Sequence, residues 1–109
     1  MPVISLNGDN FDEFTGSSVP VLVDFYAPWC GSCRTVAPIV EKLGGGTAGF
    51  DVAKVNIDEE AELARRYDVQ SIPTFAVFCD GELTDRRVGV MRERELIELV
   101  RGNSSDRMF

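Results

Sequence analysis

Apolar residues along the chain follow two patterns, one typical of strands and one typical of helices. The predicted strands cover residues 19–27, 50–58, 74–79 and 83–88. The first of these is nearly continuously apolar, with Asp24 as its one acid, and therefore suits a strand covered on both faces. The last two flank Asp80-Gly81, a pair that favours the turn of a β-hairpin.

Apolar residues at helical spacing lie between these strands. The predicted helix after the first strand begins at Cys30, contains Pro38 and stops at the glycines of residues 44–46. Its apolar side consists of Val36, Ile39, Val40 and Leu43. Further helices are predicted after a capping residue at Asp9, over residues 59–67 and over residues 92–101.

Strands that alternate with helices and end in a hairpin predict an α/β fold, with a central mixed sheet flanked by helices on both faces. The length and a hydrophobic content of 44% suit one domain over residues 1–109, of which about 103–109 are expected to be a frayed tail. In open α/β sheets, sites lie at the carboxyl ends of central strands. Cys30 and Cys33 follow such an end.

The charge narrows the possible partners. A formal net charge of −7 disfavours nucleic acid and anionic membrane surfaces, and most arginines are interleaved with acids.

No apolar run approaches the roughly 20 residues that span a bilayer. The first nine residues do not resemble an export signal, which predicts a cytoplasmic protein. Since cytosolic thiols stay reduced, its three cysteines do not indicate a structural disulfide framework.

The spacing of Cys30 and Cys33 indicates redox chemistry. Residues three apart on a first helical turn place their Cα atoms roughly 5 Å apart, within the range of a disulfide. A bridge that closes so small a ring stabilises a fold little, so reversible opening explains the pair better. Free N–H groups at the helix end favour a thiolate at Cys30, the predicted nucleophile. Cys33, one turn inside, is the predicted resolving residue.

Asp24 is the predicted proton acceptor for Cys33. It lies in an apolar strand leading into the cysteines, where burial raises the pKa of a carboxyl group toward neutrality. Lys54, also inside an apolar strand pattern, could offset its charge. The alternative is that Asp24 is a solvated acid on an edge strand.

Other readings stay open for three features. A CxxC pair is half of a zinc site, but with Cys79 as the third cysteine and no histidine, a fourth ligand would have to be a carboxylate. Trp29 could be a core residue or a contact surface beside a reactive thiol. Cys79 alternates with apolar residues and is expected to be a small buried side chain rather than a second redox centre.

Residues 23–33, VDFYAPWCGSC, resemble the active-site signature of the thioredoxin family. The resemblance continues in order and spacing through Ala37-Pro38, residues 52–58, residues 71–74, Gly81 and Val88-Gly89. It thus covers nearly the whole chain, and it implies the thioredoxin fold.

The resemblance also implies features that the residues alone do not. Ile72-Pro73 would be a cis peptide packed against the cysteines. Trp29, Ile72, Pro73 and Gly89 would form a shallow surface that binds substrate chains. No cofactor would be bound, because the redox group is the Cys30–Cys33 disulfide itself. Thioredoxin reductase, with flavin and NADPH, would supply electrons, and the protein is expected to act as a monomer.

Three departures from the family pattern bear on activity. The usual Gly-Pro between the cysteines is here Gly31-Ser32, which adds an N–H and a hydroxyl near the nucleophile and predicts a less negative potential. The glycines of residues 44–46 predict a shorter helix with a looser far end. Cys79, close to the hairpin turn, is the third.

The leading hypothesis is a protein-disulfide reductase that acts through a mixed disulfide at Cys30. A disulfide isomerase or oxidant of another compartment would use the same chemistry. A non-redox binding module built on the same fold is the alternative of a different class.

Overall fold

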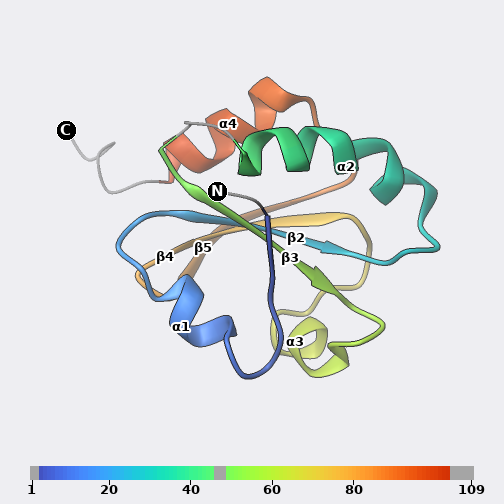
Figure 1. Cartoon of the computed structure of the whole chain (residues 1–109), viewed down its shortest axis with the longest axis horizontal. Coiled ribbons are helices and arrows are strands. Elements are labelled where there is room, and N and C mark those ends of the chain that lie inside the picture. The colour runs from blue at the N-terminus through green and yellow to red at the C-terminus, as the bar shows by residue number, and fades with distance from the viewer. Residues whose placement is uncertain (1–2, 46–48, 104–109) are drawn as a thin grey trace.

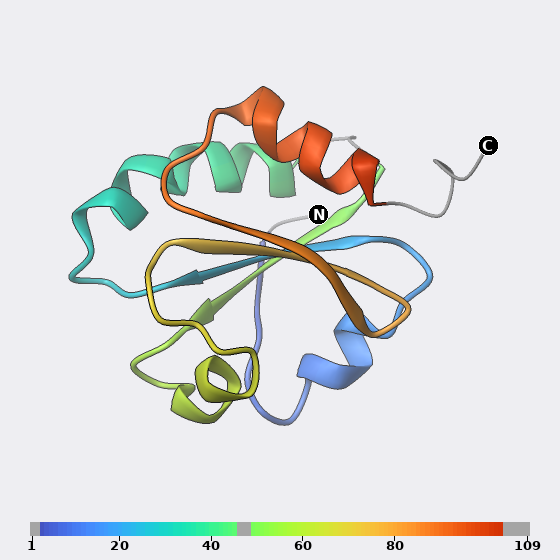
Figure 2. The ribbon, with the colours of Figure 1, turned by 180° about the vertical axis from the view of Figure 1, so that it is seen from behind.

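The computed structural model describes residues 3–45 and 49–103. In chain order the elements are β1 (Ile4–Ser5), α1 (Phe11–Thr15), β2 (Val21–Tyr26), α2 (Gly31–Gly44), β3 (Asp51–Asn56), α3 (Ala61–Arg66), β4 (Thr74–Cys79), β5 (Glu82–Val88) and α4 (Glu93–Gly102). The sheet crosses the middle of the molecule, with α2 and α4 on one face and α1 and α3 on the other (Figure 1, and from behind in Figure 2). This is the predicted α/β architecture.

The sheet is mixed and has the strand order β1-β3-β2-β4-β5. β2 pairs in parallel with β3 and antiparallel with β4, so its backbone groups are bonded on both sides. Residues 21–25 of β2 are all buried, as a nearly continuous apolar run predicts for a central strand. The strand that leads into the cysteines is therefore the central one.

Each face of the sheet has its own core, because side chains alternate along a strand. On the face toward α2 and α4, Leu22 packs in one cluster with Val52 and Phe75. On the face toward α1 and α3, Phe25 packs in a second cluster with Phe11. Register pairs Asp24 with Lys54, which places both polar side chains on the α2 face of this sheet.

The start of α2 is as predicted. Cys30 is the N-cap, with extended backbone, and the helix proper begins at Gly31. It ends at Gly44 with Gly45 as C-cap, and the third glycine, residue 46, lies outside the described residues. Gly44 is buried against the amino-terminal segment, since a Cβ built on it would lie 2.4 Å from Cγ2 of Val3.

Two predictions at the amino-terminal end were wrong or incomplete. Asp9 does not cap α1; the N-cap is Asn10, and the preceding turn is held by Oδ1 of Asn7, which accepts the N–H groups of Asp9 at 2.8 Å and of Asn10 at 3.0 Å. Strand β1 was not predicted, because two residues are too few for an alternating pattern to be recognised.

The hairpin prediction is confirmed. β4 pairs antiparallel with β5 across a turn in which Asp80 has φ 53° and Gly81 has φ 83°. Positive φ at both central positions is the requirement that Asp-Gly pairs meet. Of the expected frayed tail, only residue 103 is described, and residues 104–109 lie outside the described part.

Candidate active site

Cys30 and Cys33 lie where β2 gives way to α2, at the carboxyl end of the central strand. They form a disulfide, and their Cα atoms are 5.2 Å apart, as the sequence spacing predicted. Both are largely covered, with exposed fractions of 6% and 3%. The pair forms a small apolar cluster with Ala27, against which Ile72 packs.

The Cys30 sulfur lies within the positive end of α2. Its Sγ accepts the backbone N–H of Cys33 at 3.1 Å, and Oγ of Ser32 lies 3.5 Å from it. Gly31, the first helical residue, is exposed and leaves this end of the helix open. An N–H group that donates to the sulfur and a hydroxyl beside it stabilise negative charge there, so the geometry favours a thiolate at Cys30 once the disulfide opens.

Asp24 is a buried acid in the middle of the sheet. Its exposed fraction is 5%, and it lies on the central strand, so the alternative of a solvated acid on an edge strand is wrong. Burial raises the pKa of its carboxyl group from 3.8 to about 7, while the nearby charge of Lys54 lowers it. Among the described residues, no group donates a hydrogen bond to its buried Oδ1. Asp24 can therefore exchange a proton near neutral pH.

Lys54 reaches the same region from β3. Its Nζ lies 3.7 Å from Oε2 of Glu41 on α2 and 5.7 Å from the centre of the Tyr26 ring. Asp24, Tyr26, Glu41 and Lys54 line a cavity of about 60 Å³ between the sheet and α2. Sequence reasoning missed Glu41, although Cys33, Ala37 and Glu41 follow one another at four-residue steps along one side of the helix.

Trp29 is a surface residue. Its exposed fraction is 65%, so the alternative of a core tryptophan is wrong. The indole Nε1–H donates a hydrogen bond of 2.9 Å to Oδ2 of Asp58, which follows β3. Asp58 was not singled out from the sequence. Its position after a predicted strand could have pointed to it, because the carboxyl ends of the parallel strands β2 and β3 lie at one edge of the sheet.

The segments around Ile72 and Gly89 meet beside the cysteines. Ile72-Pro73 is a cis peptide bond, and the carbonyl oxygen of Ile72 lies 3.9 Å from Sγ of Cys30. The Gly89 N–H donates to the Pro73 carbonyl at 2.8 Å, and Gly89 has φ 103°, a conformation that favours glycine. The structure thus brings both segments to the site, as the resemblance implied.

Cys79 lies in β4, away from the pair. Its Sγ lies 2.9 Å from the carbonyl oxygen of Asn103, and burial raises the pKa of the thiol. Within residues 3–45 and 49–103, no group of three His, Cys, Asp or Glu side chains is placed to hold a metal ion. The zinc alternative therefore has no ligand set in the described structure.

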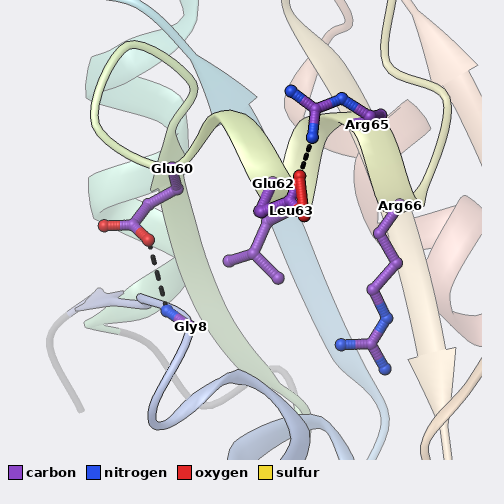
Figure 3. Close-up of a pocket in the computed structure, with 6 residues that line it drawn as sticks. All are labelled: Gly8, Glu60, Glu62, Leu63, Arg65 and Arg66. Carbon is purple, nitrogen blue, oxygen red and sulfur yellow. Dashed lines mark hydrogen bonds and ion pairs between the residues drawn. The ribbon is translucent and has the colours of Figure 1, made fainter.

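A pocket of about 430 Å³ lies elsewhere, between α3 and the amino-terminal loop (Figure 3). It is lined by Gly8, Glu60, Glu62, Leu63, Arg65 and Arg66. Its charged groups have partners within the chain: Glu60 accepts the Gly8 N–H at 3.2 Å, Glu62 pairs with Arg65, and Arg66 pairs with Asp12 at 2.7 Å.

No described helix is long and apolar enough to cross a membrane.

Comparison with known proteins decides the family. The family description "Thioredoxin" matches residues 2–102. The chain belongs to the thioredoxin family. A thioredoxin of Staphylococcus haemolyticus is 42% identical over 101 residues, which is 92% of this chain and 96% of that protein. A thioredoxin of Chlamydia pneumoniae is 42% identical over 87% of this chain and 92% of its own length.

Solved structures agree with this assignment. A mutant thioredoxin from Halobacterium salinarum superposes with a TM-score of 0.87 at 36% identity, covering 95% of this chain and 92% of that one. Thioredoxin from Malassezia sympodialis gives a TM-score of 0.83 at 32% identity and 96% coverage of both chains. The protein has the thioredoxin fold and is a thiol-disulfide oxidoreductase with protein-disulfide reductase activity, whose redox group is the Cys30–Cys33 pair.

Proposed function

We propose that Cys30 is the nucleophile, Cys33 the resolving thiol and Asp24 the proton acceptor in the reduction of protein disulfides. One observation carries this assignment: the Cys30 sulfur accepts an N–H at the end of α2, and the strand leading into that helix holds a buried acid with a pKa of about 7. Lys54 offsets the charge that Asp24 acquires as it ionises.

The reaction proceeds in two exchanges. The Cys30 thiolate attacks one sulfur of the substrate disulfide, so a Cys30–substrate bond forms and the other substrate sulfur leaves as a thiolate. The Cys33 thiol then loses its proton to Asp24 and attacks Cys30 Sγ, which releases the second substrate sulfur. The substrate gains two electrons, and the protein loses them as its disulfide forms.

The substrate surface is proposed to consist of Trp29, Ile72, Pro73 and Gly89, of which Trp29 is exposed, Ile72 and Gly89 are half-buried and Pro73 is buried. The exposed Trp29 ring offers apolar area, and the Trp29–Asp58 hydrogen bond fixes its orientation. The Ile72 carbonyl oxygen, 3.9 Å from Cys30 Sγ, is the proposed acceptor for a backbone N–H of the substrate. A shallow surface that binds backbone groups suits many substrate sequences.

Electrons are proposed to come from a thioredoxin reductase that uses flavin and NADPH, with the protein acting as a cytoplasmic, monomeric single domain over residues 1–109. Membership of the family supports the reductase, and homology with bacterial thioredoxins supports the compartment. Oxidation of NADPH by a purified thioredoxin reductase tests the electron supply. It is followed in the presence of this protein, with and without a disulfide substrate.

Insulin disulfide reduction in dithiothreitol tests the roles of the cysteines. Wild type should precipitate insulin, whereas Cys30→Ser should not exceed the background rate. Cys33→Ser should accumulate a mixed disulfide with its substrate, because the resolving thiol is missing. A Cys30→Ser, Cys33→Ser protein that kept full function would establish a non-redox binding module instead.

A second candidate is an oxidant or isomerase of another compartment. It is favoured by the Ser32 hydroxyl, which lies 3.5 Å from the Cys30 sulfur and stabilises the reduced form. Redox titration against glutathione distinguishes the two roles, because an oxidant needs a potential well above the roughly −270 mV of thioredoxin.

A further inference from the structure

The group of charges around Asp24 includes a carboxylate that the exchange reaction does not use. Lys54 is paired in register with Asp24, and its Nζ also lies 3.7 Å from Oε2 of Glu41 on α2. Asp24 is buried, whereas the side chains of Lys54 and Glu41 are 32% and 58% exposed. Lys54 therefore lies between a buried acid and an outer one, at the cavity of about 60 Å³ that all three line.

We infer that Glu41 is a positioning residue for proton exchange: its carboxylate holds the Lys54 ammonium on the solvent side of the cavity and limits how far that ammonium stabilises ionised Asp24. The inference rests on the proposed role of Asp24 as the proton acceptor.

Few other charges face Asp24, so the pairing of Lys54 has a large effect. β2 contributes the phenol of Tyr26, β3 contributes Lys54, and α2 contributes Glu41 among apolar residues. On β4, the residue opposite Asp24 is Phe75. Lys54 is the one cation among the described residues that line the cavity, and it is the charge that lowers the pKa of Asp24.

Neutralising Glu41 should therefore lower the pKa of Asp24. The like charge of the Glu41 carboxylate disappears, and Lys54 is left with Asp24 as its acidic partner at the cavity. Both changes favour the ionised form of Asp24. For charges a few ångströms apart at a half-exposed site, the expected shift is on the order of 0.5 to 1 pH unit.

The test is the titration of the Asp24 carboxyl carbon, followed by NMR in the oxidised full-length protein, where neither Cys30 nor Cys33 titrates. Glu41→Gln should lower the midpoint by about 0.5 to 1 unit. The matched control is Glu93→Gln, which removes the same charge from an exposed pair with Lys42, 3.1 Å apart. An unchanged midpoint, or equal shifts in both variants, would overturn the inference.

A Lys54→Met background tests whether Glu41 acts through the lysine. There, Glu41→Gln should shift the Asp24 midpoint by less than half as much, because the two effects are coupled. An undiminished shift would show that Glu41 acts directly, which contradicts the inference.

The pH profile of insulin reduction separates this inference from the proposed function. If both hold, the profile of Glu41→Gln moves toward lower pH together with the Asp24 titration. If the titration moves and the profile does not, Asp24 is not the proton acceptor, whereas the positioning of Lys54 by Glu41 stands. If the titration itself stays in place, the positioning role is wrong whatever the rates show.

Discussion

The buried carboxyl group of Asp24 should make the folded protein less stable as the pH rises. Its pKa is raised from 3.8 to about 7 in the folded state, chiefly by burial. The folded protein therefore binds this proton more tightly than the unfolded chain does. The stabilisation is complete below the unfolded pKa and is lost as the pH rises through about 7, the opposite of the behaviour of a salt-bridged acid.

The size of this effect on the free energy of unfolding follows from the difference between the folded and unfolded pKa values of Asp24. Relative to a group that stays protonated, Asp24 destabilises the fold by about 2 kcal/mol at pH 5.5 and by about 4 kcal/mol at pH 8.5. The difference, about 2 kcal/mol, is the quantity to measure, because contributions of other groups cancel when a variant is compared with wild type across the same two pH values.

The assay is urea unfolding of the oxidised protein at both pH values. From pH 5.5 to pH 8.5, the free energy of unfolding of wild type should fall by about 2 kcal/mol more than that of Asp24→Asn, whose amide does not ionise. The control is Asp9→Asn, an exposed acid in the loop before α1, which should track wild type. An equal change in the free energy of unfolding of wild type and Asp24→Asn between the two pH values would refute the raised pKa and, with it, the proton-acceptor role.

Three further changes have defined outcomes. Ser32→Pro removes a hydroxyl 3.5 Å from the Cys30 sulfur and an N–H at the helix end, so the potential should become more negative by about 30 mV on redox titration; an equal or less negative value contradicts this. Gly44→Ala should destabilise the fold by about 1–3 kcal/mol in urea, despite better helix propensity, because the new Cβ meets Val3. Cys79→Ser should leave insulin reduction unchanged, and Cys79 in wild type should alkylate more slowly than a free thiol, since burial raises its pKa.

Features that depend on local sequence were predictable. The apolar run before the cysteines predicted a central strand, and the three-residue spacing predicted the bridgeable pair at the start of α2. Burial of Asp24 followed from the same run, because a polar residue within a strand that is covered on both faces is buried together with its apolar neighbours. The hairpin turn at Asp80-Gly81 followed from residues that accept positive φ.

Features that depend on packing between distant segments were not predictable. Glu41 meets Lys54 only because α2 crosses above β3, and Asp58 meets Trp29 only because β2 and β3 end at the same edge of the sheet. Surface acids at such positions have no pattern that distinguishes them from solvated residues. The N-cap of α1 was misassigned to Asp9 for a similar reason, since Asn7, Asp9 and Asn10 lie within four residues and all three suit a turn or a cap.

The proposed proton-exchange role of Asp24 and its effect on stability have the same physical origin. A carboxyl group with a pKa near 4 would remain ionised at neutral pH and would be a weak acceptor for a thiol proton. Only removal from water brings its pKa to about 7, and that removal makes the ionised form unfavourable in the folded state. A substitution that stabilises the protein by removing this acid should therefore slow resolution of the mixed disulfide. In the proposed scheme, Lys54 and Glu41 tune the pKa of Asp24 between the value that suits proton exchange and the value that favours stability.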